Sequence, residues 1–337
     1  MNLLQKKRKN ITLKNTNSKK ICITIGDIEG IGIRLLIDLW KKGKINNFFL
    51  LTNFSLFKKY IKNNNIKINI KKINDNTIKQ KSNYFLIYNI QAKNNEENTY
   101  NALIKSYELY KKKYCVGIIN LPLNKEKIIN KINRNFVGQT EFYQRIEKKE
   151  TSNMIFYSNK LITCTLTTHI PIKKINLFLY KKNYIFNKIK LLFNTLKKDF
   201  NIKKPKIAFM GINPHAGENG KIGKEEIFIK KTIKRLNQSK YYIKGPFSAD
   251  SFFSKENIKY YDCFVCVYHD QALIPFKILT NFKGLNFTGS LNTLRISPIH
   301  GTGINIKNLK KANNKSLLFC FSKITKISKN RNKFDYS

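Results

Sequence analysis

The sequence predicts an α/β fold. Short apolar runs alternate along the chain with longer segments in which apolar residues recur at helical spacing. This alternation is typical of strands and helices arranged in α/β layers. The 337 residues are enough for two domains of ordinary size with a sizeable core.

The first half of the chain reads as strands and helices in turn. Four apolar runs predict strands, at residues 21–25, 48–52, 84–90 and 115–119. Other segments predict helices at residues 33–40 and 99–112, a helix followed by a strand over 58–73, and a loop over 74–82. The Gly-rich turn between the first strand and helix lacks GxGxxG spacing, so it does not support a dinucleotide fingerprint.

The second half continues the pattern. Apolar runs predict strands at residues 161–165, 206–210, 264–268 and 317–321. Helical spacing predicts helices at 177–199 and 225–236, and a polar loop is expected over 245–250. A helix is expected to begin near Thr140, whose hydroxyl either caps that helix or, with Gln139, binds a phosphate.

Composition bears on partners and compartment. The formal net charge is +45, but Lys is spread along nearly the whole chain and accompanies abundant Asn, Ile, Phe and Tyr, as translation of an A+T-rich genome would produce. We therefore expect no specific nucleic-acid partner, only weak salt-sensitive binding to polyanions. No apolar run approaches the length of a membrane span. Residues 1–20 are expected to be a disordered basic extension, and the protein to be cytoplasmic, with its six cysteines buried and reduced.

The chain contains four histidines, and three of them follow apolar strands. His169, His215 and His269 are far apart in sequence, but strand ends at one edge of a parallel sheet converge. Three imidazoles, with or without Asp250 or Asp270, suit a divalent ion such as Zn²⁺ with an open coordination position. The sequence therefore predicts a metal site, although a single histidine at a strand end is more often structural.

The segment 264–303 carries further polar groups beside a buried strand. Lys277, Asn286 and Arg295 lie among Gly and Pro residues there. Arg binds carboxylate or phosphate bidentately, and Lys acts as a point charge. Next to a metal, these groups predict a small acidic substrate.

With these residues in view, the chain resembles the 4-hydroxythreonine-4-phosphate dehydrogenases of vitamin B6 (pyridoxal phosphate) biosynthesis, the PdxA family. The resemblance covers roughly residues 21–310 and lies in many ordered motifs. These are Gly26-Asp27, Gly30-Ile31-Gly32, Pro122, Asn124-Lys125, Gly138, Thr140-Glu141, Leu166-Thr167-Thr168-His169-Ile170-Pro171, Asn213-Pro214-His215-Ala216-Gly217-Glu218, Gly245-Pro246, Ala249-Asp250, Tyr268-His269-Asp270-Gln271, Pro275, Lys277, Asn286, Thr288, Arg295, Ser297-Pro298 and His300-Gly301-Thr302.

The resemblance implies two α/β/α domains like those of isocitrate and isopropylmalate dehydrogenases, with the active site in the cleft between them. The expected division is a first domain of residues 21–135 plus 300–330 and a second of 136–299 that carries the metal and substrate. It further implies a homodimer with the site at the interface, NAD or NADP as cofactor, and a divalent metal (Zn, Mg or Co). The implied reaction oxidises 4-phosphohydroxy-L-threonine to a 3-oxo acid, which decarboxylates to an aminoacetone phosphate.

By motif position, the resemblance also implies roles for individual residues. The metal ligands would be His169, His215 and His269. The substrate would be held by Gln139, Thr140, Lys277, Asn286 and Arg295. Catalytic roles would fall to Asp250, Asp270 and Lys277; either aspartate could orient a histidine, take a proton or join the metal shell.

The chain departs from the family at several of these motifs. Gln139 stands where the family has His, so one phosphate contact loses a possible charge. Residues 289–292 replace a Leu-Gly-Leu-Pro run, Ile299 replaces Asp, and the first Gly loop is altered. Two alternatives stay open: a related dehydrogenase acting on a threonate or erythronate phosphate, and a non-catalytic basic protein that binds nucleic acid.

Overall fold

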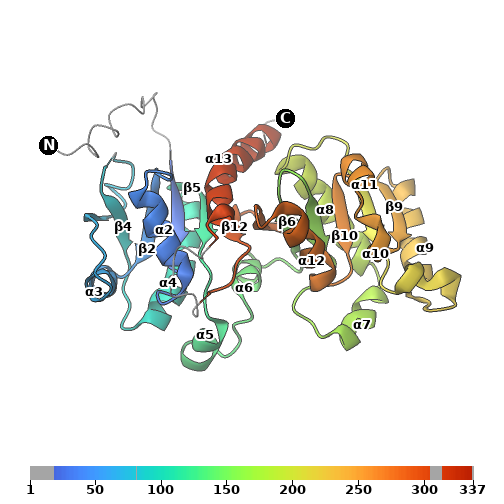
Figure 1. Ribbon diagram of the computed structural model, residues 1–337, viewed down its shortest axis with the longest axis horizontal. Helices are drawn as coiled ribbons and strands as arrows, with labels where there is room; N and C mark the ends of the chain where they lie inside the picture. The colour runs from blue at the N-terminus through green and yellow to red at the C-terminus, as the bar shows by residue number, and fades with distance from the viewer. Residues whose placement is uncertain (1–18, 81, 304–312, 336–337) are drawn as a thin grey trace. The chain divides into compact units, whose positions relative to one another are not determined.

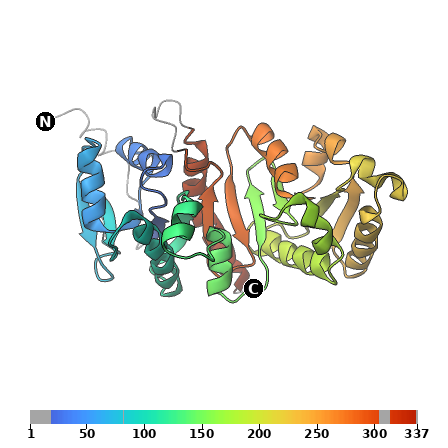
Figure 2. The ribbon, with the colours of Figure 1, turned by 90° about the horizontal axis from the view of Figure 1, so that it is seen from below.

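The computed structural model describes residues 19–80, 82–303 and 313–335, which fall into two units (Figure 1). Unit 1 comprises the described residues up to Phe136 together with those between Gly301 and Asn314. Unit 2 comprises Val137–His300 and the described residues from Lys315 onward. In each unit helices lie on both faces of the strands (Figure 1, Figure 2), as the predicted α/β class requires.

Unit 1 is built on a parallel sheet. Its strands run in the order β3-β4-β2-β1-β5, and every pair is parallel. The strands are β1 (Lys20–Thr24), β2 (Phe48–Thr52), β3 (Ile70–Ile73), β4 (Phe85–Asn89) and β5 (Cys115–Asn120). The helices are α2 (Ile31–Lys41), α3 (Phe54–Asn63), α4 (Asn95–Lys111) and α5 (Lys125–Lys131).

The inner strands of unit 1 are continuous apolar runs because a parallel sheet is covered on both faces. Every residue of β1 and β2 is buried. Lys20 is buried at the start of β1, and its ammonium donates to the backbone carbonyl of Gln80 at 2.8 Å. Lys20 is therefore not part of a disordered extension, contrary to the prediction for residues 1–20; residues 1–18 lie outside the described part of the chain.

Unit 2 is built on a mixed sheet with the strand order β12-β11-β6-β7-β10-β8-β9. The strands from β7 to β9 are parallel, whereas β6, β11 and β12 form antiparallel pairs. The bounds are β6 (Asn153–Tyr157), β7 (Ile162–Thr165), β8 (Lys206–Met210), β9 (Tyr242–Phe247), β10 (Cys263–Cys266), β11 (Leu285–Gly289) and β12 (Arg295–Pro298).

Helices surround this second sheet. They are α6 (Gln139–Ile146), η1 (Ile172–Lys174), α7 (Ile175–Leu179), α8 (Tyr184–Lys198), η2 (Pro214–Gly220), α9 (Glu225–Gln238), α10 (Ala249–Phe252), α11 (Lys255–Tyr260), α12 (His269–Thr280) and α13 (Lys315–Asp335). The core beneath α12 is aromatic and aliphatic, and Phe156, Phe264 and Phe276 belong to it.

The C-terminal segment contradicts two predictions. Residues 317–321, expected to form a strand, begin the long helix α13, and this helix belongs to unit 2 rather than to the first domain as expected for residues 300–330. Buried residues recur along α13 at helical spacing, at Leu317, Cys320, Ile324, Ile327 and Arg331. The short window 317–321 could not distinguish a buried helix from a strand.

Hydrogen bonds attach α13 to the sheet of unit 2. The hydroxyl of Ser316 donates to the Gly284 carbonyl at 2.6 Å and accepts from the Ile299 backbone N–H at 2.9 Å. Further along, the Arg331 guanidinium forms a buried ion pair with Asp199, beyond the end of α8. These contacts explain why α13 packs with β11, β12 and α8.

Three other predictions need correction. The helix expected over 177–199 is divided into α7 and α8, because Asn183 adopts a left-handed conformation with φ of 60°. The polar loop expected over 245–250 instead completes β9 and opens α10. The strand predicted over 264–268 instead spans Cys263–Cys266, and the segment after it is helical from His269, although Pro275 lies within it. Strands β6, β11 and β12 and helices α5, α11, η1 and η2 were not predicted.

The remaining expectations concern cysteines and membranes. All six cysteines are free and buried, as predicted. In the described part of the chain, no helix combines the length and apolar character that crossing a bilayer requires.

Candidate active site

Three of the four histidines follow neighbouring strands of the unit 2 sheet. His169 lies beyond the end of β7, His215 lies in η2 after β8, and His269 begins α12 after β10. Because β10 pairs in parallel with both β7 and β8, the three chain segments leave the sheet at the same edge.

Two of the imidazoles lie close together. The ring centroids of His169 and His269 are 6.2 Å apart. Each ring has a carboxylate on Nδ1: Glu141 Oε1 lies 2.9 Å from His169 Nδ1, and Asp270 Oδ1 lies 2.7 Å from His269 Nδ1. A carboxylate on one ring nitrogen orients an imidazole and leaves the other nitrogen, here Nε2, to coordinate a metal. The donor chemistry of this pair therefore fits a divalent ion.

The third histidine sits in a tightly held turn. His215 and the four residues after it have positive φ values. The buried carboxylate of Glu226 holds the start of this turn, accepting from the backbone N–H groups of Ile212 and Asn213 at 2.9 and 2.8 Å. Gly217 is required here, because its φ is +76° and a Cβ would lie 2.6 Å from Glu226 Oε2.

His215 lines a pocket of about 660 Å³ in unit 2. Asp250 and Asp270 also line this pocket, together with Tyr268 and Gln271. The Ser248 hydroxyl donates to Asp250 at 2.6 Å, and this hydrogen bond, with a smaller contribution from His215, holds the pKa of the Asp250 carboxyl below its usual value. Both aspartates are exposed, so they remain accessible to a ligand.

The described residues contain no group of three or more His, Cys, Asp or Glu side chains placed to hold a metal ion. Thus the structure brings the His169 and His269 rings together, and His215 and Asp270 line the same pocket. The three-histidine metal site stays a prediction.

The second cluster surrounds the guanidinium of Arg295, a residue that is 1% exposed. It donates to Thr288 Oγ1 at 2.8 Å, to Thr140 Oγ1 at 3.2 Å and to Gln139 Oε1 at 3.2 Å. Burial lowers the pKa of Arg295 to about 10, which still leaves it protonated at neutral pH. The fold therefore brings Gln139, Thr140 and Arg295 together, as a binding site for an anion would need.

The antiparallel pair β11–β12 explains how Arg295 reaches Thr288. Its register places Phe287 opposite Ile296, so Thr288 and Arg295 are the next residues to face each other. Asn286 precedes Thr288 by two residues and points to the same face of the sheet. The Asn286 Oδ1 atom is buried without a hydrogen-bond partner among the described residues. It is thus an acceptor that a ligand N–H or O–H could satisfy.

Lys277 lies on α12, the helix that His269 begins. Its side chain is half-buried, and no ion pair engages it within the described part of the chain. The structure does not place Lys277 within the hydrogen-bonded cluster around Arg295.

Helix α6 connects the two clusters. Its first residues, Gln139 and Thr140, contact Arg295, and the next residue, Glu141, contacts His169. Site roles were predicted for Gln139 and Thr140 but not for Glu141 or Thr288. The signal that could have identified Glu141 was its position directly after Thr140. For Thr288 it was the two-residue spacing from Asn286.

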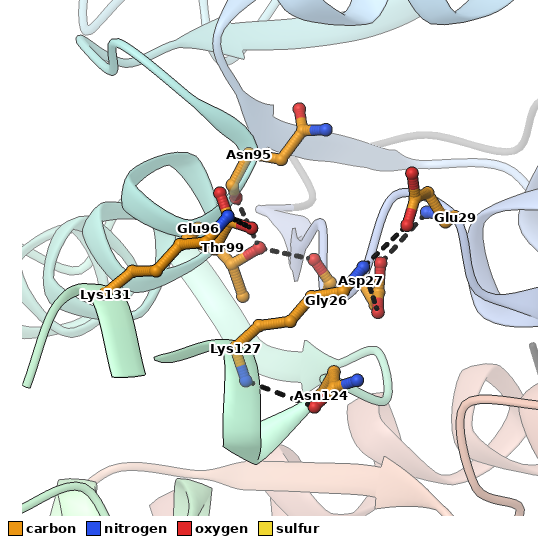
Figure 3. A network of polar contacts seen from close by, with 9 residues as sticks. All are labelled: Gly26, Asp27, Glu29, Asn95, Glu96, Thr99, Asn124, Lys127 and Lys131. Carbon is orange, nitrogen blue, oxygen red and sulfur yellow. Dashed lines mark hydrogen bonds and ion pairs between the residues drawn. The ribbon is translucent and has the colours of Figure 1, made fainter. Parts of the chain in front are cut away.

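Unit 1 carries a separate polar network at the ends of β1 and β5 (Figure 3). Lys127 contacts Glu29 at 2.6 Å and Asp27 at 3.6 Å, and the hydrogen bond with Glu29 is the main cause of its raised pKa. The Thr99 hydroxyl donates to the Gly26 carbonyl at 2.7 Å. Gly26 is required at this turn, since its φ is +65° and a Cβ would lie 2.5 Å from the Pro122 carbonyl oxygen. The network holds the Gly-rich turn after β1 against α4 and α5.

Comparison with known proteins points to one family. Residues 44–323 match the family model of the pyridoxal phosphate biosynthetic protein PdxA. A 4-hydroxythreonine-4-phosphate dehydrogenase of Sulfurihydrogenibium sp. is 32% identical over 85% of this chain and 91% of its own length. The corresponding enzyme of Aquifex aeolicus is 33% identical over 89% of this chain and 96% of its own length.

Solved structures agree on the fold. The crystal structure of 4-hydroxythreonine-4-phosphate dehydrogenase from Klebsiella pneumoniae superimposes with a TM-score of 0.79, covering 94% of this chain and 99% of that one at 24% identity. The family match spans most of the chain and includes every residue of the two clusters described above. The chain belongs to the PdxA family of pyridoxal phosphate biosynthetic proteins.

Proposed function

We propose that this protein is a metal-dependent 4-hydroxythreonine-4-phosphate dehydrogenase acting in pyridoxine 5'-phosphate (vitamin B6) biosynthesis. The observation that carries the proposal is the family match over residues 44–323, with relatives of that name 32–33% identical over 85–89% of the chain. The two clusters on either side of the first turn of α6 support it, because one suits an anion and the other suits a metal.

The substrate, 4-phosphohydroxy-L-threonine, offers a phosphate, a carboxylate, an ammonium and a hydroxyl. Arg295 and the Thr140 hydroxyl would hold the phosphate, with Gln139 fixing one edge of the guanidinium. The buried Asn286 Oδ1 would accept from the substrate ammonium or hydroxyl. Lys277 would add a positive point charge for the carboxylate.

In the reaction the hydroxyl loses its proton and its carbon loses a hydride, giving 2-amino-3-oxo-4-phosphooxybutanoate. This 3-oxo acid then loses CO₂ and takes up a proton to give 3-amino-2-oxopropyl phosphate. Asp250 and Asp270, both exposed on the wall of the pocket, are the candidates to accept the hydroxyl proton.

A divalent metal ion and a nicotinamide cofactor would supply the remaining chemistry. A divalent ion (Zn²⁺, Mg²⁺ or Co²⁺) held by His169, His215 and His269 would polarise the substrate hydroxyl and the oxygen of the keto product. NAD⁺ or NADP⁺ would receive the hydride. Glu141 and Asp270 would keep the His169 and His269 rings oriented for the ion through their Nδ1 contacts.

We further propose a cytoplasmic homodimer. The six buried free thiols suit a reducing compartment. Helix α12 exposes apolar side chains on one face, with Ile274 60% and Ile278 73% exposed, and such a face is typical of a subunit interface.

The test is an incubation of the purified protein with substrate, NAD⁺ or NADP⁺, and each of the three metal ions. Reduced cofactor should form, as read by its absorbance, and EDTA should abolish it. His269→Ala should remove the activity. Thr163→Val should not, because Thr163 is buried in β7 and its hydroxyl has no partner among the described residues. No reduced cofactor under any metal would contradict the proposal.

The same assay separates the two alternatives. A threonate or erythronate phosphate oxidised faster than 4-phosphohydroxy-L-threonine would favour the related dehydrogenase. Gln139 would be the first residue to examine, because it contacts Arg295 where the family has His. Tight nucleic-acid binding with a steep salt dependence, unaffected by His269→Ala, would favour the non-catalytic alternative.

A further inference from the structure

Thr288 forms part of the Arg295 cluster but has no role in the site described so far. It lies in the middle of β11 and is fully buried. Its Oγ1 atom accepts a hydrogen bond from Arg295 at 2.8 Å, shorter than those that Arg295 donates to Thr140 and Gln139. It also lies 3.4 Å from the Oγ1 atom of Thr140. Thr288 therefore contacts both of the residues proposed to hold the substrate phosphate.

The donor and the acceptor in the hydrogen bond between the Thr288 and Thr140 hydroxyls follow from the partners available to each oxygen. A hydroxyl has one hydrogen to donate and two lone pairs to accept with. Arg295 is a donor to both oxygens and can accept from neither. Within the described residues, the hydrogen of Thr288 has one acceptor in reach, Thr140 Oγ1. A spacing of 3.4 Å is long compared with the usual ~2.8 Å for O–H···O, so this hydrogen bond is weak, but it is the one that satisfies the buried Thr288 hydrogen among the described residues.

If Thr288 donates to Thr140, the lone pairs of the Thr140 oxygen are both used. One accepts from Arg295 at 3.2 Å and the other from Thr288. The Thr140 hydrogen must then point away from both, and Thr140 retains 7% exposure at the start of α6. Thr140 thus keeps its hydrogen for a further acceptor, and an anion is such an acceptor.

We propose that Thr288 is a positioning residue for phosphate recognition, one that fixes the Arg295 guanidinium and forces the Thr140 hydroxyl to donate to the substrate phosphate. The inference rests on the proposed function for the identity of the phosphorylated substrate. The geometry does not depend on the dehydrogenase reaction, because any phosphate monoester, or inorganic phosphate, would contact the same two donors, Arg295 and Thr140.

The variants to compare are Thr288→Val, which keeps the shape and removes the hydroxyl, and Thr288→Ser, which keeps the hydroxyl. Thr163→Val is the matched control, since Thr163 is equally buried in the same sheet and its hydroxyl has no partner among the described residues. Melting temperatures of all three variants establish that each is folded before binding is compared.

Two measurements test the inference. The first is the affinity of the metal-free protein for inorganic phosphate by titration calorimetry. Thr288→Val should weaken it about tenfold, as expected for a lost hydrogen bond to a charged group, while Thr288→Ser and Thr163→Val stay within about twofold of the parent. The second is steady-state kinetics, in which Thr288→Val should raise KM by about the same factor and change kcat much less.

The outcomes distinguish the inference from the function. If the parent protein forms reduced cofactor and Thr288→Val binds phosphate as tightly as the parent does, the proposed role of Thr288 is wrong and the proposed function stands. If the parent protein forms no reduced cofactor but binds phosphate in a manner that depends on Thr288, the proposed function is contradicted and the proposed role of Thr288 is supported. Failure of Thr288→Ser to restore binding, or of the parent to bind phosphate at all, counts against the inference.

Discussion

The contact between Glu141 and His169 gives the most direct test of the metal site. The Glu141 carboxylate oxygen lies 2.9 Å from His169 Nδ1, and this contact holds the ring that faces His269. Glu141→Gln keeps the shape of the side chain and an oxygen that can accept from Nδ1–H, but it removes the negative charge. We expect the affinity for a divalent ion to fall.

The size of the effect follows from the contact that changes. Loss of a carboxylate behind a ligand histidine typically lowers metal affinity 10- to 100-fold. The amide still accepts a hydrogen bond, and a neutral acceptor gives roughly half the strength of a charged one. We therefore expect about a tenfold loss, equivalent to ~1.4 kcal/mol. Glu141→Ala, which removes the acceptor altogether, should approach the upper end of the range.

The measurement is a Zn²⁺ titration of metal-free protein in competition with a chromogenic chelator. The control is Glu150→Gln, which makes the same chemical change at an exposed glutamate shortly after α6. Equal Zn²⁺ affinities for the Glu141 and Glu150 variants would refute the argument that Glu141 orients a metal ligand. Loss of binding in His215→Ala, together with retained folding, would show that the third histidine joins the other two.

Three further predictions concern stability and assembly. Arg331→Met leaves the buried Asp199 carboxylate without its partner and should lower the free energy of unfolding by about 3–5 kcal/mol in urea titrations, whereas adding Asp199→Leu should recover most of the loss. Burial lowers the pKa of Lys188 from 10.5 to about 8, so the unfolded chain binds more protons between these values. Below pH 8 the folded protein bears the full cost of burying the charged ammonium, and this cost decreases as the pH rises. The free energy of unfolding, measured at a series of pH values, should therefore increase for the wild type relative to Lys188→Met between pH 8 and 10.5. Parallel plots of unfolding free energy against pH for the two proteins would contradict this. Ile278→Asp places a charge on the exposed face of α12 and should convert a homodimer to monomers by light scattering, and an unchanged mass would exclude that face as the interface.

The elements predicted best were those whose signal is local. The strands β1, β2, β5 and β8 are short apolar runs bounded by polar turns, and the structure places them within one residue of the prediction. Helix α2 was also evident, because its apolar residues recur at helical spacing. These elements depend on burial of their own side chains, which a short window of sequence reports directly.

The elements that were missed depend on distant contacts. Five apolar residues at 317–321 read as a strand, and only their continuation through Ile324 and Ile327, packed on β11 and β12, makes α13 a helix. Strand β9 contains Gly245 and Pro246, both unfavourable in a strand, yet it pairs with β8 at the edge of the sheet. Local propensity was overridden by pairing and packing in both cases.

The sequence by itself determined the chemistry available to this protein. It identified the three histidines, the two aspartates and the Arg295 segment, because imidazole, carboxylate and guanidinium groups at strand ends are unusual in a chain otherwise rich in Lys, Asn and Ile. It also determined the family, since those residues occur in an ordered series of motifs.

Only the tertiary structure decided which of these groups meet. The parallel pairing of β7, β10 and β8 brings the histidine segments to one edge, and the antiparallel register of β11 and β12 sets Thr288 against Arg295. The tertiary structure also brings the Glu141 carboxylate to the Nδ1 atom of His169, a residue 28 positions away in the sequence. The physical reason is that residue type sets what a side chain can bind, whereas hydrogen bonds between distant segments set its direction, and no local pattern encodes that direction.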